Sequence, residues 1–241
     1  MSEVVNVVCM KWGEKYPSEY VNVLKGMVKR NLSLPHRFVC LTDEPEGLRP
    51  DIEVFPMPAI TVPESYDVSP WRKLGMFSQK LGDLKGKTLF LDLDIVIVDS
   101  IDDFFTYSPK FSIIENWTQA GQGIGNSSVY CFEIGAHKDV LETYTHEMDS
   151  VLKAYHNEQI FLSKKIGDID FWPEAWCQSF KRHCIPGGLM RYFKAPVLPM
   201  GCKIVVFHGL PNPPEAIHGG FFGSLRKYTR PAPWVGKYWR E

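Results

Sequence analysis

The sequence predicts an α/β fold: a single domain with a mostly parallel central sheet and an irregular C-terminal extension. Three observations support this prediction. A chain of 241 residues suits one domain with a sizeable core. Over the first two thirds, apolar segments rich in β-forming residues alternate with segments whose apolar residues recur at helical spacing. Beyond Ile169 the composition shifts to proline, glycine and aromatic residues, which is typical of irregular structure.

The N-terminal elements alternate between strand and helix. Residues 4–10 are apolar and β-rich and predict the first strand. Ser18 is a suitable N-cap for a helix over residues 18–30, which carries apolar side chains at helical spacing. Two short strands are then expected at residues 37–41 and 52–57. This order of elements is typical of parallel α/β sheets.

The strongest strand signal lies in the middle of the chain, in the run TLFLDLDIVIV from Thr88 to Val98. An amphipathic helix is predicted before it, from Trp71 to Leu84, with Gly86 after its end. The remaining expected elements are strands at 111–114, 126–134 and 203–209 and helices at 139–154 and 159–164.

Composition and charge exclude several classes of protein. The chain has 27 Lys and Arg against 28 Asp and Glu, so no global field attracts nucleic acid or an anionic membrane. No apolar run reaches the roughly 18 residues that a membrane span needs, and the N-terminus lacks a signal-peptide pattern. The six cysteines lack zinc-site or CxxC spacing. We therefore expect a cytoplasmic protein without a transmembrane segment, with buried, reduced thiols.

Two carboxylates interrupt the strongest predicted strand. Asp92 and Asp94 are two residues apart, so on one continuous strand their side chains would point to the same side. Adjacent carboxylates in a partly dry place repel each other unless a cation compensates them. Oxygen ligands of this kind suit Mg²⁺ or Mn²⁺. The alternative is that both carboxylates cap backbone amides at the end of the strand.

Two classes of enzyme carry Asp-x-Asp at such a place. The stretch DLDIVIVDS is similar to the DLDGTLVDS signature of haloacid-dehalogenase-like phosphatases, which would make Asp92 a phosphoryl-accepting nucleophile. Ile95 and Val96 stand where that signature has glycine and threonine, so the tight turn and the phosphate-binding hydroxyl are missing. This departure makes the phosphatase the alternative interpretation rather than the preferred one.

The second resemblance involves more of the chain. The stretch SPWRKLGMFSQKLGDLKGKTLFLDLDIVIVDSIDDFF resembles the corresponding stretch of glycosyltransferase family 8 and glycogenin-like enzymes, with Lys73 at the place of their donor-binding basic residue. Asn126-Ser127-Ser128 resembles their FNSGV strand, and Asn157-Glu158-Gln159 resembles their Asp-Gln pair. His208-Gly209 resembles the start of their His-Gly-x-Pro-Lys-Pro segment. These motifs follow one another in the order of that family.

This resemblance implies a GT-A-like, Rossmann-like fold and a metal-dependent, retaining transfer of sugar from a nucleotide sugar, most simply a UDP-sugar. It divides the domain into a nucleotide-binding half (1–110), a donor-sugar and acceptor half (111–215) and an aromatic and basic arm (216–241). The implied ligands of Mn²⁺ or Mg²⁺ are Asp92, Asp94 and His208. The implied catalytic residues are Glu158, Gln159 and Lys73. The implied donor-binding residues are Met10, Lys11, Gly13, Tyr16, Lys73, Asp92, Asn126, Ser127 and Gly209.

Two departures from the family pattern leave a further hypothesis open. Asn212 aligns with the lysine that grips the diphosphate, so one positive charge is missing unless Lys203, Arg226 or Lys227 replaces it. Glu158 stands where aspartate is usual. A GT-A scaffold that binds nucleotide or glycan with little or no turnover is therefore a third interpretation.

The acceptor is not specified by these motifs. Glycan, protein, lipid carrier and modified nucleic-acid base all remain open. Aromatic and basic residues gather after Asp170, where they form either an acceptor site or a C-terminal arm packed onto the core.

Overall fold

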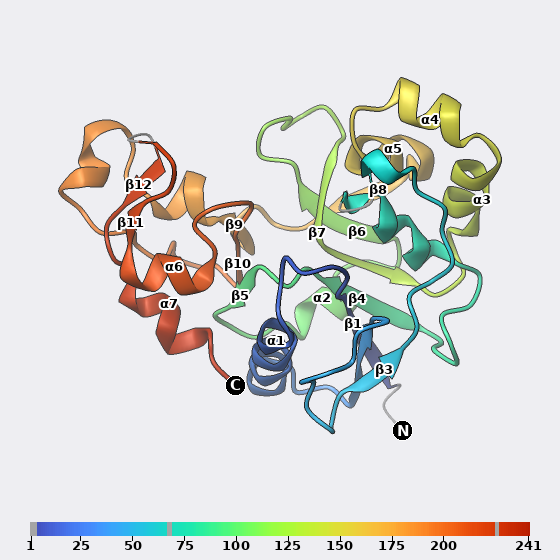
Figure 1. The fold of residues 1–241 in the computed structure, drawn as a ribbon, viewed down its shortest axis with the longest axis horizontal. Coiled ribbons are helices and arrows are strands. Elements are labelled where there is room, and N and C mark those ends of the chain that lie inside the picture. Colours follow the sequence, from blue (N-terminus) through green and yellow to red (C-terminus); the bar gives the residue numbers. More distant parts are fainter. Residues whose placement is uncertain (1–3, 67–68, 225–226) are drawn as a thin grey trace. The chain divides into compact units, whose positions relative to one another are not determined.

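A seven-stranded sheet forms the centre of the larger of two compact units in the computed structural model, which describes residues 4–66, 69–224 and 227–241 (Figure 1). This unit comprises the residues up to Glu19 together with Leu34–Asp92 and Phe104–Trp172. The second unit comprises Tyr20–Ser33, Leu93–Asp103 and Pro173–Glu241. Each unit is described by itself.

The sheet confirms the predicted mixed, mostly parallel α/β architecture. Its strand order is β3 (Glu53–Phe55), β2 (His36–Leu41), β1 (Val5–Met10), β4 (Lys87–Leu91), β7 (Gly125–Glu133), β6 (Phe111–Glu115) and β8 (Ile169–Phe171). Within this sheet, β7 runs antiparallel to both of its neighbours, and the other pairings are parallel. The chain passes from β1 to β2 on one side and later returns to β4 on the other. This reversal at β1 makes a topological switch point, the usual place for a ligand in open α/β sheets.

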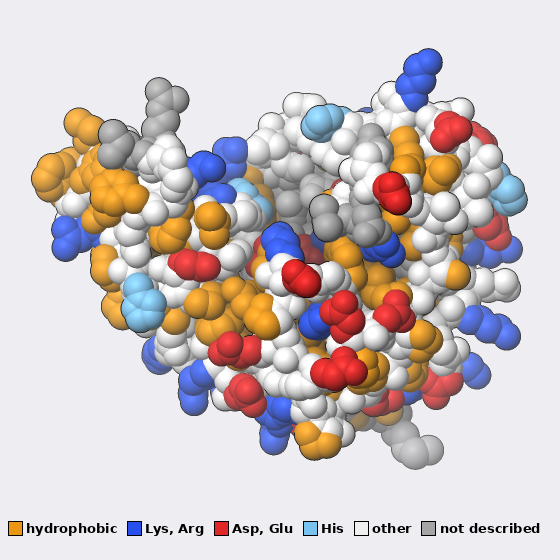
Figure 2. Space-filling model, in the orientation of Figure 1, with side chains coloured by type: hydrophobic (Ala, Val, Ile, Leu, Met, Phe, Trp, Pro, Cys, Tyr) orange, Lys and Arg blue, Asp and Glu red, His pale blue; other side chains and the backbone are white. Residues whose placement is uncertain are grey.

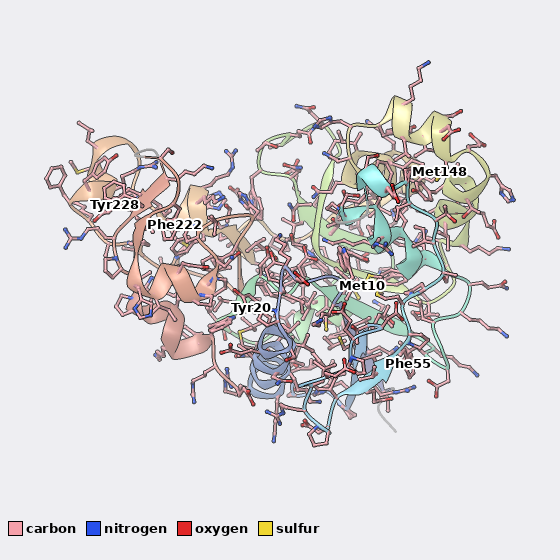
Figure 3. The ribbon with its side chains drawn as sticks, in the orientation of Figure 1. Met10, Tyr20, Phe55, Met148, Phe222 and Tyr228 are labelled. Carbon is pink, nitrogen blue, oxygen red and sulfur yellow. The ribbon has the colours of Figure 1, made fainter. Side chains whose placement is uncertain are left out.

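One face of the sheet buries an aromatic core. Phe90 of β4 and Tyr130 of β7 are cross-strand partners, and their rings stack with centroids 4.7 Å apart. Phe77 lies against Tyr130 at 5.9 Å, and Met10 at the end of β1 joins the same cluster (Figure 3). The helices that contribute buried residues to it, beside the strands, are η2 (Pro70–Phe77), α3 (Lys138–His146), α4 (Met148–Ala154) and α5 (Glu158–Ile166).

Two predicted helices differ from the observed ones. The α-helix expected from Trp71 to Leu84 is a 3₁₀ helix, η2, which ends at Phe77. Trp71, Leu74 and Phe77 are spaced by three residues, which is also the period of a 3₁₀ turn, so their spacing does not distinguish the two kinds of helix. The helix expected over residues 139–154 is two helices, because the backbone of Glu147 leaves the helical region (φ −124°, ψ 27°) between α3 and α4.

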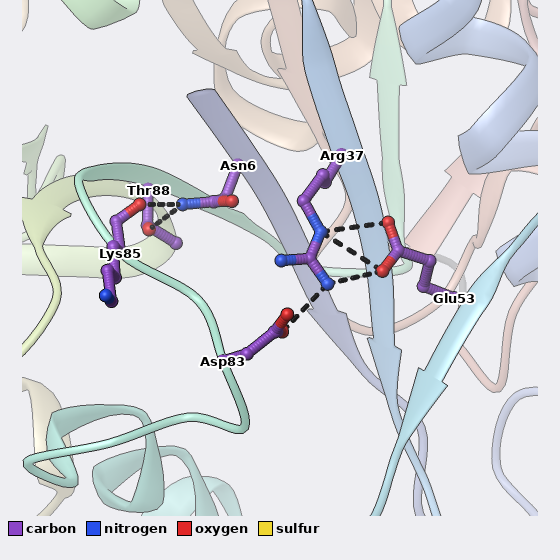
Figure 4. A network of polar contacts seen from close by, with 6 residues as sticks. All are labelled: Asn6, Arg37, Glu53, Asp83, Lys85 and Thr88. Atoms are coloured by element: carbon purple, nitrogen blue, oxygen red, sulfur yellow. Dashed lines mark hydrogen bonds and ion pairs between the residues drawn. The ribbon is translucent and has the colours of Figure 1, made fainter. Parts of the chain in front are cut away.

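Polar side chains of β1 and β2 bind β3 and the loop that precedes β4 (Figure 4). Arg37 of β2 bridges Glu53 of β3, with Nε 3.0 Å from Oε1, and Asp83, with Nη2 2.9 Å from Oδ1. The amide of Asn6 in β1 donates to the Lys85 carbonyl at 2.8 Å and contacts the Thr88 hydroxyl at 3.1 Å. These contacts attach the loop that precedes β4 to the neighbouring strands.

The second unit has a sheet of its own, with strand order β5 (Ile95–Ile97), β10 (Ile204–Val206) and β9 (Cys177–Ser179). Most of helix α1 (Ser18–Asn31) belongs to this unit, in agreement with the helix predicted at 18–30. The other elements here are the π-helical turn η3 (Phe180–Cys184), the 3₁₀ helix η4 (Gly188–Tyr192), α6 (Pro213–His218), β11 (Gly220–Phe221), β12 (Tyr228–Thr229) and α7 (Pro233–Tyr238). The last third therefore contains short regular elements.

The remaining short elements are η1 (Glu64–Tyr66) and α2 (Asp103–Thr106). All six cysteines are buried free thiols, as predicted. Within the described ranges, no helix combines the length and apolarity that crossing a bilayer requires.

Candidate active site

The run from Thr88 to Val98 is not one strand. β4 ends at Leu91 in the seven-stranded sheet, and β5 begins at Ile95 in the three-stranded sheet, with a bend between them. The prediction that Asp92 and Asp94 share one face of a continuous strand is therefore wrong. Two ionised carboxylates are costly inside a sheet that is buried on both faces, and the bend lets each carboxylate find its own partners.

Asp92 is paired with the lysine that the sequence motifs assign to the donor. Lys73 Nζ lies 2.6 Å from Oδ1 and 2.7 Å from Oδ2 of Asp92, and the two side chains are only 9 % and 18 % exposed. The ammonium also lies 3.4 Å from the Ser127 carbonyl oxygen and 5.5 Å from the centroid of the Phe90 ring. Because the ammonium is desolvated, it needs this carboxylate, and the pair fixes one ammonium and one carboxylate at the carboxyl end of β4.

Glu158 forms the second part of this cluster. The Ser127 hydroxyl donates to its Oε1 at 2.7 Å, and Glu158 is 1 % exposed in the first turn of α5. Asn157 caps that helix by accepting from the Ile160 amide at 3.0 Å. Burial raises the pKa of Glu158 above its ordinary value, whereas the charge of Lys73 and the Ser127 hydroxyl act in the opposite direction. Lys73, Asp92, Ser127 and Glu158, which the sequence motifs single out separately, thus lie in one neighbourhood.

A β-bulge aims Ser127 at this cluster. Ile113 pairs with Tyr130, but the next residue of β6, Ile114, pairs with Asn126, so residues 127–129 of β7 bulge out of the ladder. The Asn126 side chain accepts from the Ser128 amide at 3.1 Å and closes the bulge. Bulges of this kind turn a side chain away from the alternation of its strand. Asn126 therefore shapes the backbone around Ser127.

Gly125 begins β7 and packs closely against β6 beside this bulge. A Cβ at this position would lie 2.7 Å from Cδ1 of Ile113. A larger residue would therefore crowd the buried side chain of Ile113 in β6.

A pocket opens at the carboxyl ends of β1 and β2, and its lining residues are Lys11, Trp12, Gly13, Asp43, Glu44, Met57 and Arg72. Lys11 is 7 % exposed and its Nζ lies 2.7 Å from Glu44 Oε2. Gly13 has φ +60°, and a Cβ on it would meet no atom within 4 Å, so the backbone there is open to an incoming group. The pocket lies beside the switch point at β1.

Several residues of this pocket stand outside the sequence motifs. The motifs point to Lys11 and Gly13 but not to Asp43, Glu44 or Arg72. Thr42-Asp43-Glu44 follows the second predicted strand directly, and polar residues at the carboxyl ends of adjacent parallel strands meet at one edge. That signal is present in the sequence, but it becomes specific only because β1 and β2 are neighbours.

Three other predicted site residues occupy different surroundings. Met10 is 3 % exposed and packs in the hydrophobic core. Tyr16 is half-buried outside the residues that line the pocket, with Lys15 Nζ 4.5 Å from its ring centroid. Gln159 accepts from the Asn116 side chain at 3.4 Å.

In the second unit, the backbone places Asp94 and His208 at the same end of the β5–β10 ladder. The amide of Phe207 donates to the Asp94 carbonyl at 2.9 Å, so His208 follows β10 where Asp94 precedes β5. Asp94 is 8 % exposed. The Ser179 hydroxyl lies 2.6 Å from Nε2 of His208, as polar partners of metal-binding imidazoles do. Burial and the charges of Lys181 and Arg182 lower the pKa of His208 to about 4, so the ring is neutral at pH 7, the form that binds metals.

These two side chains offer oxygen and nitrogen donors that fit Mn²⁺ or Mg²⁺. Across the described residues, no three His, Cys, Asp or Glu side chains form a ready-made metal cluster. Magnesium-type sites commonly use one or two carboxylates and complete their coordination with water and substrate phosphates. The donor set of Asp94 and His208 is suited to a site of that kind.

A lysine outside the sequence motifs lies beside His208. Lys181 of η3 donates to the His208 carbonyl, and its Nζ is 3.3 Å from where a Cβ on Gly209 would be. Burial and Lys227 lower the pKa of Lys181, whereas the charge of Asp94 raises it, so the ammonium is within electrostatic reach of that carboxylate.

At position 212, where the family resembled by the sequence has a lysine, this chain has an asparagine with a structural role. Asn212 is the N-cap residue of α6, and its backbone amide donates to Glu215 at 2.9 Å. Lys203, one of the suggested substitutes, is paired with Asp103 at 2.7 Å. Arg226, another, lies outside the described residues.

Glu158→Gln is expected to stabilise the protein at neutral pH and not at acidic pH. A carboxyl whose pKa is raised by folding stabilises the native state while it is protonated, and this contribution is lost as the pH rises from the ordinary value of 4.5 through the raised pKa. Glutamine does not ionise, so the variant does not lose this stability as the pH rises. Urea unfolding between about pH 4 and pH 8 measures the difference in unfolding free energy between the two proteins. An equal difference at every pH would contradict the raised pKa of Glu158.

Known proteins resemble this chain in structure rather than in sequence. No protein-family model matches it, and neither does any curated protein sequence. A solved structure of the galactosyltransferase LgtC with donor and acceptor sugar analogues matches with a TM-score of 0.59 at 12 % identity, covering 86 % of this chain and 88 % of LgtC.

Two further solved glycosyltransferases match over part of their own lengths. The bifunctional glycosyltransferase WbbM matches with a TM-score of 0.56 at 14 % identity, covering 88 % of this chain and 47 % of WbbM. The glycosyltransferase GlyE of Streptococcus pneumoniae matches with a TM-score of 0.56 at 14 % identity, covering 94 % of this chain and 59 % of GlyE. The chain therefore has the GT-A-like fold of these glycosyltransferases.

Proposed function

We propose that the protein is a metal-dependent glycosyltransferase that takes a sugar from a nucleotide sugar, most simply a UDP-sugar, and transfers it with retention of configuration. The observation that carries the proposal is the buried cluster of Lys73, Asp92, Ser127 and Glu158 at the carboxyl end of β4. It lies beside the switch point of a fold shared with sugar transferases.

The pocket at the ends of β1 and β2 suits the nucleoside part of such a donor. Lys11 and Glu44 form its polar side and Trp12 its aromatic side, while the open backbone at Gly13 permits close approach. Sites for nucleoside-sized ligands combine a mostly apolar surface with a few placed polar groups. Met10 is buried in the core at the end of β1 and is not among the residues that line this pocket.

Breaking the bond between the sugar and the diphosphate leaves negative charge on the phosphates. A divalent ion held by Asp94 and His208 would supply Lewis-acid stabilisation of that charge. Lys181 adds a positive charge beside Gly209 and takes the role of the lysine that is absent at Asn212. The sequence motifs assign Asp92 to the same ion, and that assignment stays a prediction.

Positive charge develops on the sugar ring at the same time. Glu158 and Gln159 begin α5 and provide a carboxylate and an amide for the ring and its hydroxyls. The largely buried ion pair of Lys73 and Asp92 lies close to Glu158, with Ser127 contacting both Lys73 and Glu158. No side chain is assigned here as a nucleophile or a general base.

Incubation of the protein with Mn²⁺ and a panel of nucleotide sugars tests the proposal. We expect one donor to release its nucleoside diphosphate slowly even without an acceptor, because water can replace the acceptor. Release from no donor, together with hydrolysis of p-nitrophenyl phosphate that depends on Asp92, would favour the phosphatase interpretation. Tight nucleotide binding without any release would favour the binding module.

A further inference from the structure

Charge is distributed unevenly along this nearly neutral chain. Residues 175–240 contain ten Lys and Arg but a single acidic residue, Glu215. The rest of the chain carries 17 Lys and Arg against 27 Asp and Glu. The second unit contains this whole basic segment, so the segment carries a strong local positive charge that the net charge of −1 conceals.

The most exposed apolar side chains lie in the same segment. Among the described residues, every large apolar side chain that is at least 60 % exposed falls between positions 189 and 221. These are Leu189 (73 %), Phe193 (71 %), Val197 (67 %), Met200 (96 %) and Phe221 (60 %). Single exposed apolar residues are ordinary, but a group of them marks a surface that binds something.

Ring contacts link η4, which carries Leu189, to β11, which carries Phe221, through Tyr228 of β12. Tyr192 of η4 stacks on Tyr228 of β12 with centroids 5.1 Å apart, and Tyr228 contacts the Phe221 ring at 4.6 Å. Arg230 Nη1 reaches the Tyr192 carbonyl at 3.4 Å. Apolar side chains gather over this part of the molecule in Figure 2, and Figure 3 labels Tyr228 there. We call the surface of Leu189, Met190, Phe193 and Phe221 the apolar face.

Basic residues flank the apolar face. Arg191 and Lys194 alternate with its apolar residues on and after η4, and Lys227 and Arg230 flank its aromatic partner Tyr228. Lys194, Lys227 and Arg230 are exposed. An apolar surface rimmed by cations matches the boundary of an anionic bilayer, where acyl chains lie beneath negatively charged headgroups.

We propose that the apolar face docks on the surface of a membrane that contains anionic lipids. Phe193, Leu189 and Phe221 enter the boundary between headgroups and acyl chains, while Lys194, Lys227 and Arg230 pair with lipid phosphates. The proposal goes beyond the transfer reaction and does not depend on it. Charge complementarity selects this partner over a second copy of the chain, because two such basic surfaces would repel each other.

Vesicle sedimentation tests the docking. We expect the 241-residue protein to bind vesicles that contain about one third phosphatidylglycerol and to bind pure phosphatidylcholine vesicles weakly. Raising the salt from about 0.1 M to 1 M shortens the Debye length from about 10 Å to 3 Å and should release most of the protein. Leu189→Ser with Phe193→Ser should weaken binding at least tenfold. Lys194→Gln with Arg230→Gln should weaken it about 25-fold, about fivefold for each charge.

Matched variants in the other unit separate docking from general effects of charge and hydrophobicity. Val4→Ser with Val54→Ser removes exposed apolar groups, and Lys153→Gln with Lys164→Gln removes exposed charges; both pairs should leave binding unchanged. All substituted side chains are exposed, so thermal melts should not move.

Three outcomes would overturn the proposal. One is that wild-type protein leaves both kinds of vesicle unbound, and another is that it binds both equally well. The third is a dimer in sedimentation velocity, or a complex with single-stranded DNA, that Leu189→Ser with Phe193→Ser abolishes while vesicles stay unbound. Donor release in vesicle-free solution is measured separately, so a failure here leaves the proposed reaction untouched.

Discussion

Replacing Asp94 with asparagine is expected to lower Mn²⁺-dependent donor hydrolysis by about 100- to 1,000-fold, the usual cost of removing a group that stabilises developing charge. Asp94 is 8 % exposed and directly precedes β5 at the end of the β5–β10 ladder that His208 follows. Asparagine keeps the size of the side chain and removes its charge. The rate measured over a range of Mn²⁺ concentrations should show both a lower maximum and a need for more metal.

Two further variants show whether the loss of donor hydrolysis is specific to the proposed metal site at Asp94. In the proposed site Lys181 acts on the phosphates, so Lys181→Met should lower the maximal rate about 100-fold and should not raise the Mn²⁺ requirement, because it removes a positive charge near Asp94 and His208. Asp99→Asn is the matched control, since Asp99 is an exposed carboxylate of the same unit, and it should change neither quantity. Full activity in Asp94→Asn would remove this residue from the proposed site.

Replacing Lys73 with methionine is expected to reduce both activity and stability. The substitution leaves Asp92 without its cation and removes the positive charge that opposes the raised pKa of Glu158. Breaking a buried ion pair by removing one partner costs about 3 kcal/mol of unfolding free energy. Urea unfolding measures this loss, and donor hydrolysis should fall by about 100-fold or more.

A double-mutant cycle identifies the cause of the lost stability. Lys73→Met with Asp92→Asn should lose less than the sum of the two single variants, because the second change removes the orphaned charge. The exposed pair of Lys110 and Asp168, 2.7 Å apart, is the control, and Lys110→Met should cost less than about 1 kcal/mol. Additive losses at Lys73 and Asp92 would contradict the coupling.

Local patterns in the sequence identify several members of the candidate site. Two aspartates in an apolar run are costly wherever the chain folds, so Asp92 and Asp94 stand out from their neighbours alone. Lys73, Ser127 and Glu158 are found through their order along the chain, and all three lie close to Asp92 or to one another in the folded protein. Their functions remain predictions, whereas their proximity is an observation.

Other members depend on contacts between distant segments. Lys181 lies in an unremarkable basic pair, and only the packing of η3 against the end of β10 brings its ammonium to His208. Glu44 joins the pocket because β2 pairs with β1. The bulge that aims Ser127 depends on the register between β6 and β7, which no local pattern encodes.

Periodicity and the cost of desolvation act locally, so the chain's own patterns specify the fold class, the positions of most strands and the residues whose burial demands a partner. Long-range packing sets where the strongest predicted strand ends. Thr88 to Val98 is uniform enough to be one strand, yet its halves pair in different sheets, β4 with β1 and β7, and β5 with β10. Distant segments determine which strands pair, and here their pairing makes Asp92 follow one strand and Asp94 precede another.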